Sequence, residues 1–281
     1  MNIEEYLTGA KSAGTAKRYL REIGLFKDCL AYPEHATYSD VMAYIGEVRK
    51  QGLKPAVPLA AIKSYFDYLV AEGIRKDHPA KSIRLRDGKS KDVQLQDLFS
   101  EAELERLLDR QERYPILANR NRLIVSFLIY QALTNGEVKS LELADISLPL
   151  GTVRIRAGRN RARTLRLRPN QAFWLMEYLQ NDRPQLAKSP TNKLLLTKLG
   201  KAESGEGIGY LLECSHHLFP ERRLNAIAIR QSVIANLLKA GHDLRVVQEF
   251  VGHKSPSTTE KYRQSHAEEL RAEVVKRHPL G

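Results

Sequence analysis

The chain has 281 residues, and 45 lysines and arginines against 33 aspartates and glutamates give it a formal net charge of +12. This length suits two domains or one large one, and a composition with 42% hydrophobic and 28% charged residues is typical of soluble globular proteins. The longest apolar run, 123–133, is too short to span a bilayer, the opening MNIEEY is not expected to be a secretory signal, and two cysteines provide neither a disulfide framework nor a zinc cluster.

The first 80 residues are expected to form a small helical domain. Apolar side chains recur at helical spacing in residues 15–26, 41–48 and 59–69. His78-Pro79-Ala80 should end a helix, because proline biases the residue before it away from the α conformation. Residues 81–97 are polar and basic without helical periodicity, which predicts an interdomain linker.

A second domain is predicted over residues 98–281. It opens with Ser100 and Glu103, whose spacing is that of a capping box at the start of a helix. The mostly apolar residues 122–133 predict a helix at the centre of its core. Further elements are expected along the chain: a helix around 173–179, a strand-like segment at 194–196, a helix over 226–240 that is capped by Asn225 and closed by Gly241, and a helix over 244–250.

Residues 151–170 carry much of the positive charge, with seven arginines and no acidic residue. Alternation of apolar residues with arginines on both sides of residues 157–160 predicts a β-hairpin with one face on a core. Seven unpaired guanidinium groups would repel one another unless phosphates lay opposite, so the pattern favours a nucleic-acid contact over a solvated strand face. The seven are Arg154, Arg156, Arg159, Arg161, Arg163, Arg166 and Arg168. The fold class expected from all these elements is mainly α with a small antiparallel sheet.

The segment from Ala240 to Tyr262 reads AGHDLRVVQEFVGHKSPSTTEKY. It resembles the terminal motif of tyrosine recombinases of the phage integrase family, in which Leu-Gly-His precedes Thr-Thr-x-x-Tyr. The counterparts here are Val251-Gly252-His253 and Thr258-Thr259-Glu260-Lys261-Tyr262. The resemblance covers most of the chain, and its weaker parts are residues 15–26, 65–69, 78–80, 99–101 and 141–146 with the hairpin that follows.

The resemblance implies a two-domain DNA clamp, with a helical, SAM-like core-binding domain over 1–80 and an integrase-type catalytic domain over 98–281. In the family a tyrosine attacks a DNA phosphodiester, leaving a 3′-phosphotyrosine and a free 5′-hydroxyl, and a second hydroxyl reverses the step. The resemblance therefore implies no metal ion, no other cofactor and no ATP. It also implies double-stranded DNA as partner, dimers or tetramers on that DNA, alone or with other recombinase subunits, and a cytoplasmic, nucleoid-associated location in a prokaryote.

Site roles follow from the same resemblance. Tyr262 matches the nucleophile, Arg230 the second of two phosphate-binding arginines, and His253 the late histidine of the family. Arg161, or in another alignment Arg159, matches a hairpin lysine that protonates the leaving oxygen. The residue types alone leave other interpretations open, which are a structural tyrosine, a buried ion pair at Arg230 and a capping or core histidine at His253.

This chain departs from the family pattern at several positions. Thr134 stands where the first arginine is expected, Ile227 replaces a histidine three residues before Arg230, and Gln231 replaces a histidine directly after it. An arginine at the hairpin lysine position binds phosphate well but is a poor proton donor, because its pKa is above about 12. Removing one preorganised donor typically lowers a rate by about 10²–10³, so the combined losses should be severe unless other groups compensate.

The arginine-rich hairpin offers that compensation. Our hypothesis is that Arg159, Arg161 or Arg163 supplies the charge missing at Thr134. The remaining candidates for DNA binding are the hairpin arginines Arg154, Arg156, Arg159, Arg163, Arg166 and Arg168, with Lys54 and Lys63 in the N-terminal domain.

Three functions remain open from the sequence. The first is a site-specific recombinase, and the second is a catalytically impaired DNA-binding accessory protein of a mobile element. The third is a helical scaffold whose basic hairpin binds RNA or an acidic protein, which leaves the terminal motif unexplained. The tail after Tyr262 has Leu270 and Val274 at helical spacing, and it either docks on a neighbouring protomer or packs on its own domain.

Overall fold

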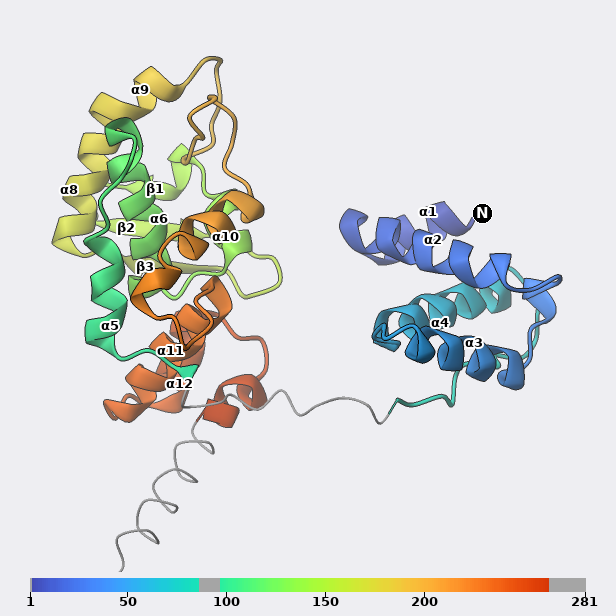
Figure 1. Ribbon diagram of the computed structural model, residues 1–281. Coiled ribbons are helices and arrows are strands. Elements are labelled where there is room, and N and C mark those ends of the chain that lie inside the picture. The colour runs from blue at the N-terminus through green and yellow to red at the C-terminus, as the bar shows by residue number, and fades with distance from the viewer. Residues whose placement is uncertain (1, 86–96, 263–281) are drawn as a thin grey trace, which may run out of the picture. The chain divides into compact units, whose positions relative to one another are not determined.

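The computed structural model describes residues 2–85 and 97–262 (Figure 1). The chain divides into two compact units, Met1–Lys91 and Asp92–Gly281. Most of the predicted linker, and the tail with Leu270 and Val274, lie outside the described residues. None of the helices described is both long and apolar enough to cross a bilayer.

The described part of the N-terminal unit contains four α-helices: α1 (Ile3–Ala10), α2 (Ala13–Asp28), α3 (Tyr38–Lys50) and α4 (Ala56–Ala71). Phe26 of α2 and Phe66 of α4 are fully buried and pack edge to face, with ring centroids 6.2 Å apart. Ile45 of α3 belongs to the same core. The helices predicted from residues 15–26, 41–48 and 59–69 are thus confirmed.

The chain after α4 folds back on this helix. Helix α4 ends at Ala71, before Gly73 with a φ of +70°, so His78-Pro79 does not end it as predicted. The Lys63 ammonium of α4 instead donates to the carbonyl oxygens of Lys81 and Ile83 at 3.3 and 2.7 Å. Residues 81–85 are thereby attached to the N-terminal unit rather than standing free as a linker.

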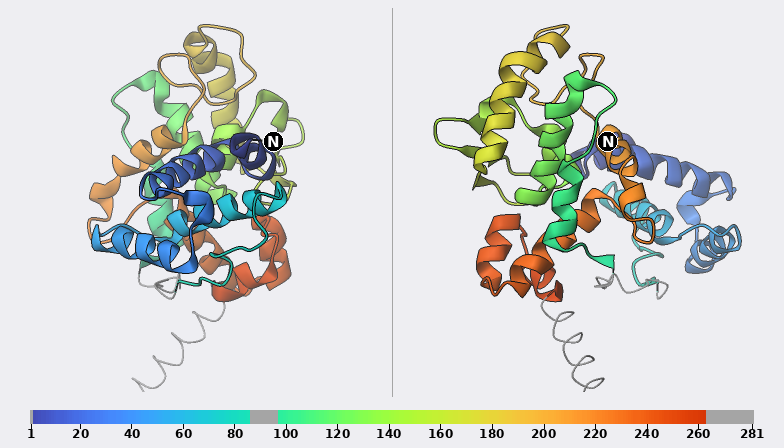
Figure 2. Two further views of the ribbon diagram at one scale, coloured as in Figure 1. Left: turned by 90° about the vertical axis from the view of Figure 1, so that its right-hand side faces the viewer. Right: turned by 60° about the vertical axis from the view of Figure 1, so that its left-hand side comes forward.

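Helix α6 (Ala118–Tyr130) lies at the centre of the C-terminal unit and packs on α8, α10 and α11 (Figures 1 and 2). The helices around it are α5 (Glu101–Glu105), α7 (Asn135–Ser140), α8 (Pro169–Glu177), α9 (Arg183–Leu186), α10 (Gly205–Glu213), α11 (Ala226–Lys239) and α12 (Leu244–Val251). The Ser100–Glu103 capping box is formed at α5, as predicted. The predicted helix over 122–133 is confirmed as the core helix, but it ends at Tyr130 because Ala132 adopts a left-handed φ of 49°.

A small antiparallel sheet contains the predicted hairpin. Its strands β1 (Ile146–Ser147), β2 (Thr152–Ile155) and β3 (Arg163–Arg166) pair in the order β1-β2-β3. Val153 faces Leu165 across β2 and β3 and both are buried, which confirms the predicted alternation. Residues 194–196 form only an isolated bridge to Ala202 and no strand, so that prediction is wrong. The fold class, mainly α with a small antiparallel sheet, is confirmed.

The end of the chain is organised by helix caps. The side chain of Asn225 accepts hydrogen bonds from the amides of Ile227 and Ala228, each at 2.9 Å, and so begins α11 where predicted. Helix α12 ends at Gly252, whose φ of +73° is the left-handed conformation that glycine adopts without steric cost. Residues 256–262 are helical again.

Candidate active site

Arg230 lies in the middle of α11 with its guanidinium buried. It donates to the carbonyl oxygen of Ala132 and, at 2.6 Å, to that of Val251. Ala132, whose backbone is left-handed, thus supplies one of the two carbonyl oxygens that hold Arg230. Burial lowers the pKa of Arg230 to about 10, which still leaves the side chain charged at neutral pH.

Glu137 joins the separate parts of the site. Its Oε2 accepts hydrogen bonds from the amide and hydroxyl of Thr134, at 2.8 and 3.0 Å, and lies 3.9 Å from Nη1 of Arg230. Its Oε1 accepts from Nη1 of Arg163 at 2.6 Å and from Asn160 at 3.2 Å. Burial raises the pKa of Glu137, but the hydrogen bonds from Arg163 and from the Thr134 backbone outweigh it and hold the pKa below its ordinary value.

Sequence reasoning missed Glu137, although a signal was available. Thr134 and Glu137 have the spacing of a capping box, and the structure shows that box formed at the start of α7. Thr134, which the sequence analysis expects at the position of the family's first arginine, therefore caps a helix and orients a carboxylate.

Arg163 is the most buried arginine of the hairpin, with 6% of its side chain exposed. Apart from Nη1, its guanidinium lacks partners: Nε and Nη2 are buried and have no hydrogen-bond acceptor among the described residues. Gly252 lies directly against it, since a Cβ at Gly252 would stand 2.8 Å from Nη1 of Arg163.

His253 follows Gly252 and is buried. Its Nδ1 lies 2.8 Å from the hydroxyl of Thr259, which positions the ring. Burial, and then the charges of Arg230 and Arg163, lower the pKa of His253 to about 4. The imidazole is therefore neutral at pH 7, and when the Thr259 hydroxyl donates to Nδ1, the ring proton is on Nε2.

Tyr262 is 8% exposed and lies within electrostatic range of Arg230. Burial raises the pKa of its phenol, and both the Arg230 charge and a hydrogen bond from the Gln231 side chain oppose that rise. Gln231, expected from the resemblance to stand in place of a histidine, thus contacts the tyrosine. Ile227, expected to stand in place of the other histidine, is 71% exposed on the first turn of α11.

The structure thus brings together Arg230, His253 and Tyr262, and adds Arg163 and Glu137. The side chain of Arg161 is exposed and donates to the carbonyl oxygen of Lys254 at 3.1 Å, outside this cluster. Arg159 is exposed too, although its charge contributes, after burial, to the lowered pKa of Arg230. Among the described residues, no group of three His, Cys, Asp or Glu side chains could hold a metal ion.

The expectation that the hairpin arginines lack acidic partners is wrong for four of them, because the chain supplies carboxylates from outside the hairpin. Arg163 pairs with Glu137, as described. The other three pairings are Arg154 with Asp145, Arg156 with Glu142 and Asp145, and Arg168 with Glu101 and Glu105. Within the described part of the chain, the other three, Arg159, Arg161 and Arg166, have no ion pair with a carboxylate.

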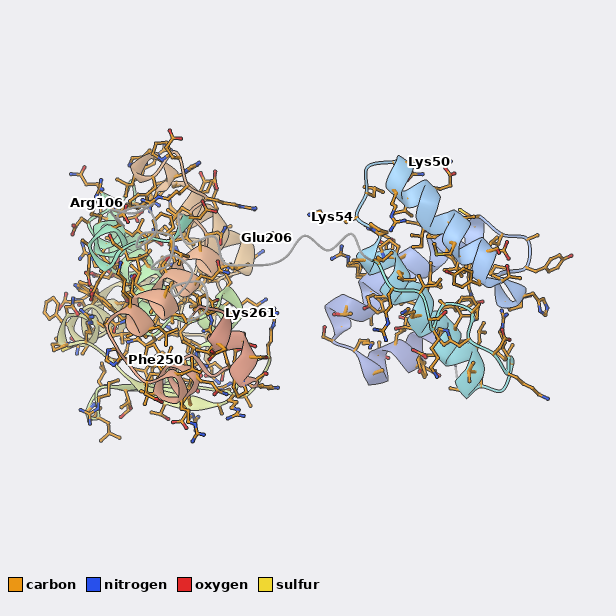
Figure 3. All side chains as sticks on the ribbon, turned by 90° about the horizontal axis from the view of Figure 1, so that it is seen from below. Lys50, Lys54, Arg106, Glu206, Phe250 and Lys261 are labelled. Carbon is orange, nitrogen blue, oxygen red and sulfur yellow. The ribbon has the colours of Figure 1, made fainter. Side chains whose placement is uncertain are left out.

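The two lysines predicted to bind DNA differ. Lys54 is exposed at the edge of the N-terminal unit (Figure 3). Lys63 is half-buried, and its ammonium is engaged by the carbonyl oxygens of Lys81 and Ile83. Lys54 is therefore the better placed of the two for an outside partner.

The chain is similar to known proteins over most of its length. The profile of the phage integrase family matches residues 98–269. The chain belongs to this family. It is 30% identical to the tyrosine recombinase XerC of Pelotomaculum thermopropionicum in an alignment of 299 positions. The alignment covers 99% of this chain and 97% of the relative. It is 29% identical to the XerC of Roseiflexus sp. (strain RS-1), over 89% of this chain and 83% of the relative.

Solved structures share the fold at lower identity. XerH site-specific recombinase bound to palindromic difH substrate, in a post-cleavage complex, matches with a TM-score of 0.72 and 21% identity, covering 92% of this chain and 79% of XerH. The Tn1549 transposon integrase in complex with transposon right end DNA matches with a TM-score of 0.69 and 15% identity over 99% of both chains. Both likenesses extend over both units of the chain.

Proposed function

We propose that this protein is a site-specific DNA recombinase that cleaves and rejoins strands through a covalent bond between Tyr262 and a 3′-phosphate. The observation that carries the proposal is the burial of Tyr262 within electrostatic range of Arg230. A surface tyrosine with a merely structural role has no need of a buried cation, and a buried arginine is rarely found without a reason for its charge.

The chemistry divides among the residues of the cluster. The phenolic oxygen of Tyr262 forms a bond to phosphorus while the bond to the 5′ oxygen breaks, and negative charge builds up on the phosphoryl oxygens. The phenol gives up its proton to water, and the 5′ oxygen takes one from water and leaves as a hydroxyl. Arg230 stabilises that charge in a site shielded from water, where such stabilisation is strongest. His253, neutral at pH 7, donates from Nε2 to a phosphoryl oxygen. Arg161 lies outside the cluster on the hairpin loop, and an arginine there can add positive charge but is a poor donor of the proton for the leaving oxygen.

Exposed cations of both units hold the DNA. We assign Arg159 and Arg166 of the hairpin and Lys54 of the N-terminal unit to the DNA backbone, with a smaller share for Arg154, Arg156 and Arg168, which already have carboxylate partners. In this proposal residues 1–80 form the core-binding domain, residues 98–281 form the catalytic domain, and protomers assemble as dimers or tetramers on DNA.

Nicked suicide duplexes, tiled across the genomic DNA on both sides of the gene, test the proposal. The nick lets the short 5′ product diffuse away, so a covalent protein–DNA adduct accumulates and withstands SDS. We expect an adduct with the wild type and none with Tyr262→Phe at equal DNA affinity. Equal binding without any adduct from the wild type contradicts the proposal.

DNA binding without any adduct from the wild type would instead support a DNA-binding accessory protein. Two observations favour this alternative: Thr134 caps α7 in place of an arginine, and Ile227 puts an apolar side chain on the exposed first turn of α11.

A further inference from the structure

The position of the missing arginine is occupied by a residue that cannot replace it. Thr134 uses its hydroxyl and its amide in the capping box with Glu137, and it carries no charge. Arg230, the cation that the family pattern retains, already directs Nη1 and Nη2 to two carbonyl oxygens. The cluster around Tyr262 therefore needs another donor to hold a phosphate with two arginines.

Arg163 has donors to spare. Its Nη1 is bound to Glu137 at 2.6 Å, while Nε and Nη2 are buried and unpartnered among the described residues. Leaving buried donors of a charged group unpaired costs free energy, so such groups are found where a ligand satisfies them. Nε and Nη2 form one side of the guanidinium fork, which matches two oxygens of a tetrahedral oxyanion.

Local charge also favours an anion. The charges of Arg163 and Arg159 both act electrostatically on Arg230. Glu137 is the carboxylate that contacts Arg163 and Arg230, so these four side chains carry a net charge of 3 − 1 = +2. The two other hairpin candidates are placed less well, because Arg159 is exposed and Arg161 is exposed with its guanidinium on the Lys254 carbonyl.

The hairpin loop next to Arg163 is attached to residues 252–254. Three hydrogen bonds fasten this loop to residues 252–254: Arg161 N to Gly252 O at 2.8 Å, Arg161 Nη2 to Lys254 O at 3.1 Å, and Lys254 Nζ to Gly158 O at 2.9 Å. Arg161 and Lys254 are exposed cations, so a DNA backbone competes directly for two of these three contacts.

We propose that Arg163 replaces the missing first arginine, and that its Nε and Nη2 bind the oxygens of the scissile phosphate once DNA draws the hairpin loop away from residues 252–254. Glu137 is then a positioning residue, since it fixes Nη1 and so points the opposite side of the fork toward the phosphate. This inference rests on the proposed function for its substrate, but the oxyanion site itself is testable without a DNA target.

The decisive variant is Arg163→Lys, which keeps a cation for Glu137 and removes the fork. The matched control is Arg113→Lys, an exposed arginine whose guanidinium stacks on the Tyr114 ring. In the first measurement, tungstate is titrated into each protein and the unfolding midpoint is followed. We expect tungstate to stabilise the wild type and Arg113→Lys alike, and to need at least a tenfold higher concentration with Arg163→Lys.

The second measurement is the rate of Tyr262-dependent adduct formation on the nicked duplexes. Losing one preorganised donor should slow the reaction of Arg163→Lys by about 10²-fold, with Arg113→Lys within threefold of the wild type. A purely structural role for Arg163 would lower the unfolding midpoint without changing tungstate affinity or the adduct rate below that midpoint, and this result overturns the proposal.

The two measurements also separate this inference from the proposed function. If the wild type forms no adduct, the recombinase proposal fails, and tungstate binding alone then decides whether Arg163 belongs to an oxyanion site. Unchanged tungstate binding in Arg163→Lys, or an adduct rate within threefold of the wild type, overturns the assignment of Arg163.

Discussion

Arg156 and Arg163 lie on the same hairpin, and each donates to a glutamate oxygen at 2.6 Å. Their surroundings are opposite, because the side chain of Arg156 is 45% exposed and that of Arg163 only 6%. Water screens the outer pair, and such pairs contribute little to stability. Water hardly reaches the inner pair, so its strength depends on every remaining hydrogen bond of both groups. Equal distances therefore hide unequal surroundings, and in our proposal the outer pair belongs to the surface that meets DNA and the inner pair to a preorganised site.

The largest expected difference between the inner pair, Arg163 with Glu137, and the outer pair, Arg156 with Glu142, is the effect of removing the carboxylate on the free energy of unfolding. Glu137→Gln keeps a side chain that can complete the capping box with Thr134 but removes the one negative charge between Arg163 and Arg230. Uncompensated buried charge is expensive, so we expect a loss of about 3 kcal/mol in the free energy of unfolding.

Urea denaturation followed by circular dichroism measures this loss. Glu142→Gln, which removes the carboxylate of the outer pair with Arg156, is the matched control and should leave the urea midpoint almost unchanged. Equal midpoints for the two variants would show that burial does not separate the two regions.

Gly252→Ala tests the packing against Arg163. The added Cβ would meet Nη1 of Arg163 at 2.8 Å, at a residue with a φ of +73°. Gly151→Ala has a similar φ of +59° but meets nothing within 4 Å, so it measures the backbone cost alone. We expect about 1 kcal/mol for Gly151→Ala and about 1 kcal/mol more for Gly252→Ala, from thermal unfolding. Identical losses would contradict the close contact with Arg163.

The inner region should also respond to pH through His253. Its folded-state pKa of about 4 lies below the ordinary value of 6.5, so the unfolded chain binds more protons between these two values. The free energy of unfolding should then fall as the pH decreases from 6.5 to 4, by about 2 kcal/mol after allowance for partial solvent screening.

Denaturation curves between pH 7 and 4, for the wild type and His253→Gln, measure this dependence. The variant should show a flatter profile in that window. Glu103 and Glu142, whose pKa values the arginine hydrogen bonds lower to about 2, lose their contribution only below about pH 4.5 and do not obscure it. A profile unchanged by the substitution would mean that His253 titrates as an exposed histidine does.

The smallest expected effect concerns the outer region and the DNA backbone. Arg166→Ala should lower the slope of log affinity against log salt concentration by about 0.9 on any duplex. Arg156→Ala should lower that slope less, because Arg156 is already paired with Glu142 and Asp145. Fluorescence anisotropy at several salt concentrations gives both slopes, and equal changes would mean that the acidic partners are displaced on binding.

Local sequence rules predicted much of this fold. The hairpin followed from the alternation of apolar residues and arginines, and α11 began at Asn225 because a side-chain oxygen there satisfies free amides. The terminal motif correctly indicated the family. These features depend on neighbours within a few residues, which the sequence displays directly.

The partners of the arginines could not be predicted in the same way. Glu137 and Arg163 are 26 residues apart, and Arg230 binds a carbonyl oxygen 98 residues before it. Such pairings are set by the packing of α7, β3 and α11 around α6. Strand β1 was not predicted from the sequence either, because it forms only by pairing with β2. Asp145, the residue before β1, supplies the carboxylate that Arg154 and Arg156 share.

The cap at Thr134 bears on how positions 134 and 163 depend on each other. Thr134→Arg, which introduces the residue type that the family resemblance leads us to expect there, would remove the hydroxyl that accepts from the Glu137 amide and cost about 1 kcal/mol of helix capping. It would also crowd a third guanidinium against a carboxylate that already serves Arg163 and Arg230. An arginine at position 134 should therefore be tolerated better when Arg163 is replaced at the same time, so the two positions are expected to be energetically coupled.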